Sequence, residues 1–306
     1  MNPAHVPVMT SEVIAALAIK PGAIHIDCNI GDGGHAEAIL NASRDVFLLG
    51  IDLDADALDA AEARLSGYVS SIRLVHGNFA DVASIAVGSR ARDASGVLFD
   101  LGVSSRQLDT AERGFSFRQE APLDMRFDIE SRTTAADIVN RYSERDLEAI
   151  IRDLGEEPRA RAVARAIVRN RRIETTTELA RVVTGALNYP AHSRVHPATR
   201  TFQALRMAVN SELENLEQGL LGAIETLQKG GRLVTLTYHS IEDRVVKNLM
   251  RREAVDCICL PSAPTCICDH KASVRLINRR VLTPTREEIR SNPRARSAKM
   301  RIAEKL

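Results

Sequence analysis

The chain has 306 residues, of which 44% are hydrophobic and 26% are charged, and its formal net charge is only +1. This composition excludes a mainly disordered chain, and it excludes attraction of nucleic acid by overall charge, so such a partner would need local basic patches. No signal-peptide pattern or apolar run of membrane-spanning length is present, so we expect a soluble, cytoplasmic protein without a membrane partner. Four of its five cysteines lie between positions 257 and 268, unlike the spacing of a secreted disulfide framework.

The first diagnostic stretch is a glycine-rich turn between an expected strand and an expected helix. Residues 23–27 alternate apolar and polar side chains up to Asp27, and three glycines follow at Gly31, Gly33 and Gly34. This order is typical of a parallel strand followed by a helix at a nucleotide site. The spacing also fits a dinucleotide fingerprint. The carboxylate of Asp27 instead favours a ligand with an ammonium group and no phosphate, such as S-adenosylmethionine.

Three more expected strands end in candidate ligands. They lie at 46–52, within 72–79, which also includes the exit loop, and at 96–100. Asp52 and Asp100 end their strands, and Phe79 ends the exit loop. Because ligands bind beyond the carboxyl ends of parallel strands, we expect these side chains at one site. Asp52 suits the hydroxyls of a ribose, the alternative being a helix N-cap. Phe79 suits stacking on an adenine, the alternative being an ordinary core position.

The next convincing strand, at 232–240, begins much further along the chain than a single crossover requires. We therefore expect an inserted, mostly helical substrate-recognition domain at 108–196. The two parts of the parent domain are then 1–107 and 197–306. A helix expected at 199–228 is assigned to the parent domain, with Gly230 and Gly231 as its stop signal.

The expected insert carries two candidate substrate contacts. Its opening loop, 113–126, contains Arg113, Phe115 and Phe117. Its most informative helix, at 158–172, presents a stripe of arginines on one face with no acidic residue within the stretch. Phosphates are the natural counter-charge for such a stripe, the alternative being a solvated helix face. The stripe consists of Arg161, Arg165, Arg169 and Arg172.

Two Cys-x-Cys pairs stand near the C-terminal end, separated by a short loop that contains proline. A hairpin through this loop could bring all four sulfur atoms together, which suggests a structural zinc site. Reduced buried thiols and ordinary hairpin packing are the alternatives. The residues concerned are Cys257, Cys259, Cys266 and Cys268, with His270 close behind.

Seven motifs together resemble the bacterial 16S ribosomal RNA cytosine-N4 methyltransferases, and the resemblance runs from His5 to the C-terminus. They are Ile-Gly-Asp-Gly-Gly-His at 30–35, Asp-Leu-Gly-Val-Ser-Ser-x-Gln-Leu-Asp at 100–109, Glu-Arg-Gly-Phe-Ser-Phe at 112–117, Pro-Leu-Asp-Met-Arg at 122–126, His-Pro-Ala-Thr-Arg-Thr-Phe-Gln-Ala-Leu-Arg at 196–206, Tyr-His-Ser-Ile-Glu-Asp-Arg at 238–244 and Asn-Pro-Arg-Ala-Arg-Ser-Ala-Lys at 292–299. The family's usual Thr-x-Gly turn reads Asn29-Ile-Gly31 here, which leaves the glycines intact.

The resemblance implies an α/β fold, namely a Rossmann-like class I methyltransferase sheet with an inserted helical domain. It implies S-adenosylmethionine as methyl donor and, as partner, 16S ribosomal RNA within the small ribosomal subunit, with a cytosine of the decoding region as target. Carried over position by position, the cofactor contacts are Gly33, Gly34, His35, Asp52, Phe79, Asp100 and Gln107. Of these, His35 and Gln107 rest on the resemblance alone.

For the chemistry, we expect direct in-line transfer to the cytosine amine, because an exocyclic amine needs no thiolate to activate it. Asp100 is the first candidate acceptor for the amine hydrogens, and the candidate helpers are Ser104, Ser105, His239 and Ser240. Amino-methyltransferases often stack the base on an aromatic residue after the fourth strand, and 100–104 has none. Phe115, Phe117 or Tyr238 could replace it.

Two other functions fit parts of this pattern. A dinucleotide-dependent dehydrogenase would use the same glycine turn and Asp52, and it would be stabilised by NAD instead of S-adenosylhomocysteine. A non-catalytic ribosome-assembly factor would keep the fold but transfer no methyl group.

Overall fold

A computed structural model describes residues 7–187, 196–260 and 265–306. The chain divides into two compact units, of which the first comprises Met1–Gly102 and Leu213–Leu306 and the second Val103–Glu212. The helical unit therefore extends beyond the expected insert, 108–196, at both ends. No helix in the described ranges has the length and apolar character that would be needed to span a membrane.

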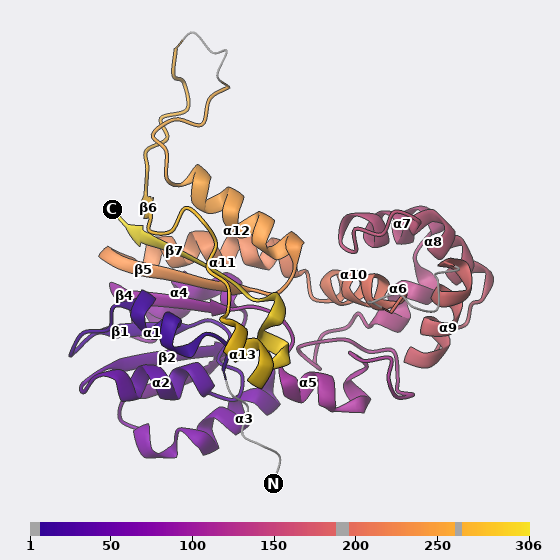
Figure 1. The fold of residues 1–306 in the computed structure, drawn as a ribbon, viewed down its shortest axis with the longest axis horizontal. Helices are drawn as coiled ribbons and strands as arrows, with labels where there is room; N and C mark the ends of the chain where they lie inside the picture. The colour runs from indigo at the N-terminus through magenta and orange to yellow at the C-terminus, as the bar shows by residue number, and fades with distance from the viewer. Residues whose placement is uncertain (1–6, 188–195, 261–264) are drawn as a thin grey trace. The chain divides into compact units, whose positions relative to one another are not determined.

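The first unit is built on a seven-stranded sheet, which confirms the expected α/β class. Its strand order is β3-β2-β1-β4-β5-β7-β6, and the strands from β3 to β5 run parallel, while β7 pairs antiparallel with both β5 and β6. Figure 1 shows the C-terminal strands lying beside those of the N-terminal segment. The strands are β1 (Ile24–Asp27), β2 (Phe47–Asp52), β3 (Ile72–His76), β4 (Ala94–Asp100), β5 (Leu227–Thr237), β6 (Val274–Leu276) and β7 (Lys299–Lys305).

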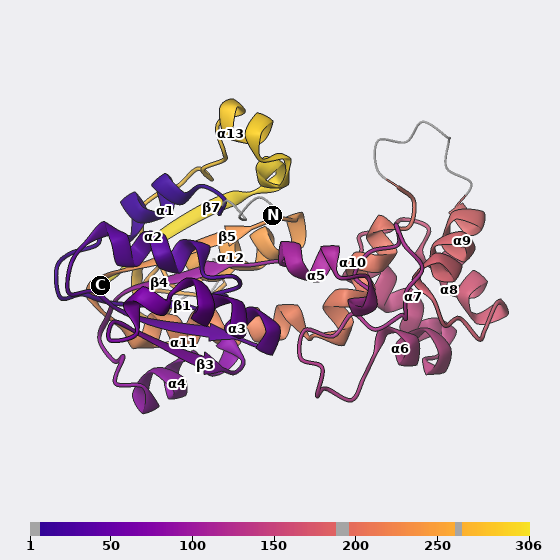
Figure 2. The same ribbon diagram turned by 90° about the horizontal axis from the view of Figure 1, so that it is seen from below.

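Helices cover both faces of this sheet. They are α1 (Thr10–Leu17), α2 (Gly34–Ala42), α3 (Ala55–Arg64), α4 (Val82–Gly88), α11 (Glu212–Thr226), α12 (Ser240–Arg252) and α13 (Arg286–Ser291). Figure 2 shows α1 and α2 on one side and α4 and α11 on the other. The alternation of side chains along a strand supplies both cores, because Leu48 packs with the first group and its neighbour Leu49 packs with the second.

The second unit is helical and has its own apolar core. Its helices are α5 (Ser105–Asp109), α6 (Ala135–Arg141), α7 (Glu144–Asp153), α8 (Ala160–Arg169), α9 (Thr176–Leu187) and α10 (Thr199–Val209). Short 3₁₀ turns occur at Ser66–Tyr68, Phe79–Asp81, Ala111–Arg113 and Pro293–Ser297.

The single helix expected at 199–228 is in fact two helices, and the first belongs to the second unit. The break falls at Asn210 and at Ser211, whose φ is 48°. The amide of Asn210 donates to the carbonyl of Met125 and accepts from the N–H of Phe127. Phe202 and other apolar residues of α10 are buried in the helical unit, and this burial decides the assignment.

The expected stop signal of that helix also has a different place. α11 ends at Thr226 and β5 begins at once, so Gly230 and Gly231 lie inside the strand. The pairing of β5 with β4 shifts register between Ala94 and Gly96, opposite this part of the strand. The glycines therefore accompany an irregularity in the sheet rather than a helix end.

Candidate functional site

The glycine turn joins β1 to α2 as the sequence predicts. Gly33 is the N-cap of α2 with φ 78°, a left-handed conformation that favours glycine. A Cβ at Gly33 would lie 3.2 Å from the side chain of Leu65, and one at Gly34 would lie 3.0 Å from the ring of Pro7. Side chains at either position would push the turn away from its neighbours. The turn thus needs glycine for both conformation and space.

Asp52 ties the end of β2 to this turn. Its Oδ2 accepts the N–H of Gly31 at 2.9 Å, and its Oδ1 accepts the N–H of Asp54 at 2.9 Å. Burial raises the pKa of Asp52 to about 6. The N-cap of α3 is Asp54, whose side chain accepts the N–H of Asp56, so the N-cap alternative for Asp52 is wrong. The backbone N–H of Leu53 also hydrogen-bonds to Asp52. A carboxylate has about four acceptor positions, so capacity remains to accept a ribose hydroxyl.

A buried group of ionisable side chains lies at the carboxyl ends of β1 and β4. Asp27 is 1% exposed, and burial raises its pKa to about 7. His35 is 4% exposed, and its Nε2 lies 3.4 Å from Oδ2 of Asp100. Burial alone would lower the pKa of His35, but the charges of Asp100 and Asp27 outweigh it and raise that pKa. Two carboxylates around one imidazole make this edge of the sheet attractive to a cationic group.

Tyr238, just after β5, completes this group. Its hydroxyl donates to Oδ1 of Asp100 at 2.7 Å, and burial raises the pKa of the phenol well above its usual value. Its ring also fills the space where a Cβ on Gly102 would stand, at 3.2 Å. From the sequence, Tyr238 was expected only as a possible stacking residue, because no local pattern signals this hydrogen bond. Tyr238 positions the carboxylate of Asp100.

Two buried polar groups here have no hydrogen-bond partner within the described ranges. They are Nδ1 of His35 and Oδ1 of Asn29. Buried polar atoms in native proteins are normally satisfied, so a ligand at this edge would supply the missing partners. S-adenosylmethionine fits these donors and acceptors, since its amino-acid end carries an ammonium and a carboxylate. His35, Asp27, Asp52 and the glycine turn are the residues that would hold it.

The other expected residues of this unit have more ordinary surroundings. Phe79 is half-buried and meets Phe99 edge to face, with ring centroids 5.5 Å apart, so it already has a core contact. His239 caps α12 by accepting the N–H of Glu242, and its Nε2 lies 2.9 Å from the Glu242 carboxylate. This cap gives His239 a structural role. The exposed Ser240 begins α12.

Three expected site residues lie at the start of the second unit, where Ser104 is the N-cap of α5 and Ser105 and Gln107 are within it. Ser104 and Gln107 form a capping box, in which the side chain of each accepts the backbone N–H of the other. Gln107 is 6% exposed. The side chain of Ser105 lies outside the described part of the structure. The roles of these three residues in cofactor binding and catalysis stay predictions.

The loop at the start of the second unit is largely occupied by internal contacts. Phe115 is 8% exposed and stacks on Phe127 with centroids 5.5 Å apart, so its expected contact with RNA does not fit the structure. The guanidinium of Arg113 donates hydrogen bonds to the carbonyls of Arg126 and Phe127, so it is engaged in contacts within the unit. Phe117 is half-buried and stacks on His196 at 4.5 Å. Phe117 is the more accessible of the two phenylalanines.

The arginine stripe is exposed, as expected, but two details differ from the prediction. α8 ends at Arg169, so Arg172 stands beyond the helix. Glu144 of α7 lies 3.6 Å from Arg165, so the fold supplies a counter-charge that the stretch itself lacks. Both partners are nearly half exposed, and such pairs contribute little to stability. The stripe therefore remains largely available.

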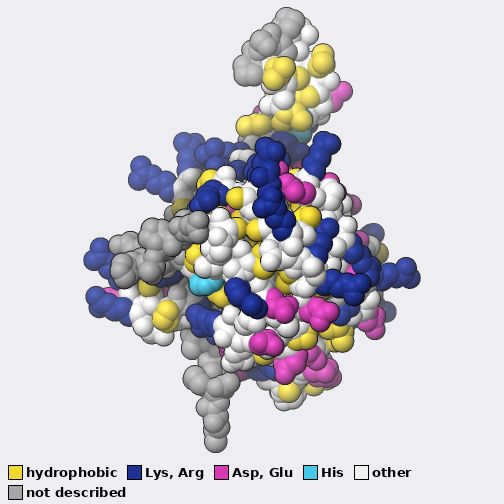
Figure 3. All heavy atoms as spheres, turned by 90° about the vertical axis from the view of Figure 1, so that its right-hand side faces the viewer, with side chains coloured by type: hydrophobic (Ala, Val, Ile, Leu, Met, Phe, Trp, Pro, Cys, Tyr) yellow, Lys and Arg dark blue, Asp and Glu magenta, His cyan; other side chains and the backbone are white. Residues whose placement is uncertain are grey.

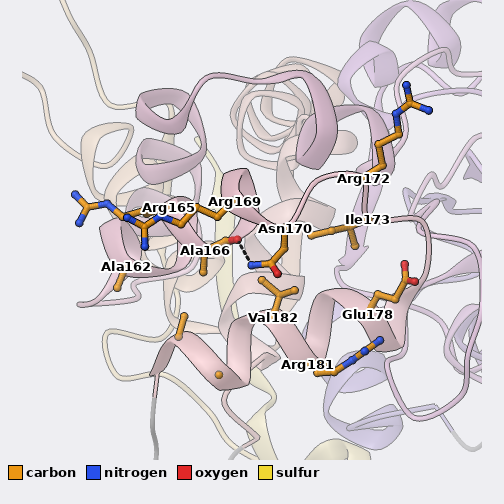
Figure 4. A pocket seen from close by; sticks show the side chains of 12 residues that line it. Ala162, Arg165, Ala166, Arg169, Asn170, Arg172, Ile173, Glu178, Arg181 and Val182 are labelled. Atoms are coloured by element: carbon orange, nitrogen blue, oxygen red, sulfur yellow. Dashed lines mark hydrogen bonds between the residues drawn. The ribbon is translucent and has the colours of Figure 1, made fainter.

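Part of the stripe lines a groove of about 680 Å³ between α8 and α9. Figure 4 shows Arg165 and Arg169 on one side of this groove and Arg181 on the other. The acidic residue in its lining is Glu178, whose carboxylate accepts the backbone N–H groups of Glu174 and Thr175. Arg181 was not expected at this site, because no local sequence pattern relates it to the arginines of α8. Four arginines against one glutamate make the groove attractive to phosphate.

The comparisons with known proteins identify the family of the chain. The sequence model of the MraW methylase family matches residues 2–306. A ribosomal RNA small subunit methyltransferase H from Dehalococcoides mccartyi is 52% identical, with 99% of this chain and 86% of the relative covered. A protein of the same name from Pelobacter propionicus is 50% identical, with 99% of this chain and 98% of the relative covered.

Solved structures are more distant. A protein from Streptococcus mutans in complex with SAH has 10% identity and a TM-score of 0.46, with 99% of this chain and 100% of that chain covered. An rRNA methylase from Streptococcus thermophilus has 10% identity and a TM-score of 0.43, with 99% of each chain covered. Both TM-scores are below 0.5, so the assignment rests on the sequence matches. The chain belongs to the MraW methylase family and is a methyltransferase that uses S-adenosylmethionine.

Proposed function

We propose that this chain methylates the exocyclic N4 amine of a cytosine in the decoding region of 16S ribosomal RNA, by direct in-line transfer. The observation that carries the proposal is the match over the whole chain to relatives named ribosomal RNA small subunit methyltransferase H. The motifs from residue 30 to residue 299 support the finer choice of nucleotide and atom. The dehydrogenase alternative does not agree with membership of a methylase family.

The residues at the edge of the sheet suit an amine acceptor. S-adenosylmethionine, when bound, supplies a methyl group made electrophilic by its sulfonium. Asp100 has 21% of its side chain exposed, with Tyr238 on Oδ1 and His35 near Oδ2, so it is held in place yet accessible. A fixed carboxylate can accept the hydrogen bonds of an amine and orient its nitrogen as positive charge develops.

A mechanism through a cysteine adduct has little support here. Cys28 is 1% exposed, lies in the core, and has a thiol pKa raised by burial. A thiolate nucleophile needs the opposite surroundings. The other four cysteines lie together in the segment between α12 and β6. Direct transfer to an amine requires none of them.

The basic groove between α8 and α9 is our candidate for contact with the RNA backbone. Arg165, Arg169, Arg172 and Arg181 line it. Arginine binds phosphate through two parallel hydrogen bonds, and each neutralised phosphate adds to the salt dependence of binding. Among the expected aromatic contacts, Phe117 remains the candidate for holding an unstacked base, whereas Phe115 is a core residue.

Transfer of a radiolabelled methyl group tests the proposal. Naked 16S ribosomal RNA and assembled small subunits are each incubated with the enzyme and labelled S-adenosylmethionine, and the nucleosides are then separated. We expect the label in N4-methylcytidine from a single decoding-region site. Label in another nucleoside would contradict the choice of atom. Binding of S-adenosylhomocysteine without transfer to either substrate would favour the non-catalytic assembly factor.

The role of Asp100 is tested with a matched pair of variants. Asp100→Asn should reduce the single-turnover methylation rate by orders of magnitude, because the amide cannot accept the amine hydrogens as a carboxylate does. Tyr238→Phe removes one hydrogen bond to the same charged carboxylate, a loss of about 1.5–3 kcal/mol, and should lower the rate by about tenfold to a hundredfold. Binding of S-adenosylhomocysteine is measured for both. Equal rates for Asp100→Asn and the parent enzyme would remove Asp100 from the mechanism.

A further inference from the structure

The segment between α12 and β6, residues 253–273, is not explained by methyl transfer. We call it the cysteine arm, since it carries Cys257, Cys259, Cys266 and Cys268. Figure 1 shows it leaving the sheet unit as a narrow excursion. Residues 261–264 lie outside the described part of the structure, whereas all four cysteines belong to the described part.

The four sulfur atoms converge on one point. All four Sγ atoms lie within 4.8 Å of one another. Cys266 Sγ is 3.6 Å from Cys268 Sγ, and Cys268 Sγ is 3.9 Å from Cys257 Sγ. Zinc–sulfur bonds of about 2.3 Å in a tetrahedron place neighbouring sulfurs about 3.8 Å apart. A disulfide would need about 2.05 Å, and all four thiols are free.

Backbone N–H groups support the sulfur cluster from both pairs. The N–H of Ile258, between the first two cysteines, donates to Cys268 Sγ at 3.4 Å. The N–H of Ile267, between the second two, donates to Cys259 Sγ at 3.4 Å. Each pair thus holds a sulfur of the other pair. Such outer-shell hydrogen bonds orient ligands and offset negative charge on metal-bound sulfur.

In the described part of the arm, the large apolar side chains beside the cysteines are exposed. Ile258 is 48% exposed, Leu260 76% and Ile267 83%. Figure 3 shows hydrophobic side chains, a class that includes cysteine, on the surface of this projecting part. The alternative of buried thiols is wrong for Cys257 and Cys266, because both are exposed. A short excursion without a core needs a cross-link, and a metal is one means of providing it.

His270 is not part of the ligand set. Its Nε2 lies 2.9 Å from the carbonyl oxygen of Arg252, a hydrogen bond that occupies this nitrogen. The candidate metal group at this place in the described part of the chain contains the four cysteines and not His270. The donor set is therefore four sulfurs, which zinc accepts in closed structural sites.

We propose that Cys257, Cys259, Cys266 and Cys268 bind one zinc ion, which fixes the cysteine arm. Binding would release the thiol protons to solvent as each sulfur becomes a thiolate ligand. Four protein ligands fill the tetrahedral coordination of zinc and leave no position for water or substrate. The site is therefore structural, and methyl transfer does not pass through it.

Metal analysis of the full chain tests this proposal. The protein is made without an affinity tag, purified under reducing conditions without added metal, and measured by plasma mass spectrometry. We expect about one zinc per chain. The variant Cys266→Ser/Cys268→Ser should lose at least nine-tenths of it, while Cys28→Ser and His270→Ala should keep it. Thermal stabilisation of each variant by S-adenosylhomocysteine checks that the sheet unit is folded.

Cobalt provides a second measurement on the same variants. Replacing zinc by Co²⁺ should give the intense visible absorption of a tetrahedral thiolate site in the parent chain and in His270→Ala, and none in the double variant. Zinc near zero in parent protein that also fails to bind added zinc or cobalt would overturn the proposal. Iron in place of zinc, or disulfides between these cysteines in freshly purified protein, would overturn it as well.

Discussion

At the scale of single residues, the site contains carboxyl groups whose pKa values are raised towards 7 by burial. Asp27 has a pKa of about 7 and Asp52 of about 6, because both are largely removed from water. Asp100, by contrast, is partly exposed and has two close partners. Three acids at neighbouring strand ends thus have different surroundings and different expected roles. Perturbed carboxyls at one edge of a sheet are a mark of a functional site.

Asp27 should destabilise the unliganded protein at high pH. Its folded pKa of about 7 lies above the ordinary value of 3.8, so the cost of ionising it is absent below pH 3.8 and grows until about pH 7. Asp27→Asn removes this cost. Relative to the parent chain, its stability in urea should increase by roughly 2–3 kcal/mol between pH 5 and pH 8. A stability difference that does not change with pH would show that Asp27 does not titrate in this range.

Asp52 is expected to hold the ribose of the cofactor. Each hydrogen bond to a charged group contributes about 1.5–3 kcal/mol, so Asp52→Ala should weaken binding of S-adenosylhomocysteine at least tenfold by calorimetry. Asp54→Ala is the control, because it removes the N-cap of α3 and should cost about 1 kcal/mol of stability without a tenfold loss of affinity. Equal affinities of the two variants would refute the assignment.

At the scale of elements, α8 combines a buried face with a charged one. Val163, Ala164 and Ile167 pack into the core of the helical unit, while Arg161, Arg165 and Arg169 are exposed. The sequence alone predicted this division, since the arginines recur at helical spacing. The tertiary structure added Arg181 from α9 across the groove and Glu144 from α7 beside Arg165.

Charge reversal on α8 should weaken RNA binding and its dependence on salt. In Arg165→Glu/Arg169→Glu, loss of one or two phosphate contacts should lower the slope of log affinity against log salt by about 0.7–2. Arg145→Glu/Arg152→Glu on α7 changes the net charge equally at exposed positions outside the groove lining, and should leave the slope nearly unchanged. Filter binding at several salt concentrations measures the slope for both variants and the parent chain. Identical slopes would show that the arginines of α8 face solvent and do not contact phosphate.

At the scale of the whole molecule, the helical unit is one continuous segment of the sequence. It separates the two segments that form the sheet unit. Residues 103–212 have their own apolar core, which includes Leu123, Ile138, Leu147 and Phe202. The sheet unit needs both of its segments, because β5 pairs with β4 and β7 pairs with β5. The two units therefore differ in whether they can be produced separately.

We expect residues 103–212 to fold when expressed alone. Their core is contained within the segment, so the isolated unit should show a helical far-ultraviolet spectrum and a single cooperative transition in urea. The same segment carrying Leu147→Ala should lose about 2–5 kcal/mol of stability, because Leu147 is fully buried in that core. Helical signal without a cooperative transition would show that the unit depends on the rest of the chain.

The sequence by itself determined the elements and the ends of the strands. An alternating stretch predicted β1, apolar runs predicted the next three strands, and the glycine turn predicted the start of α2. Asp27, Asp52 and Asp100 followed from their places at strand ends. These features are local, since periodicity and turn chemistry are written in neighbouring residues. The seven motifs predicted the family for the same reason, because each is a short contiguous stretch.

Only the tertiary structure decided which distant residues meet. The bond from Tyr238 to Asp100, the approach of His35 to the same carboxylate and the groove between α8 and α9 all join segments far apart in sequence. It also moved α10 into the helical unit, because burial of Phe202 outweighed the expected continuity with α11. Such contacts depend on strand order and on competition between cores for apolar side chains, and neither leaves a mark in a local pattern.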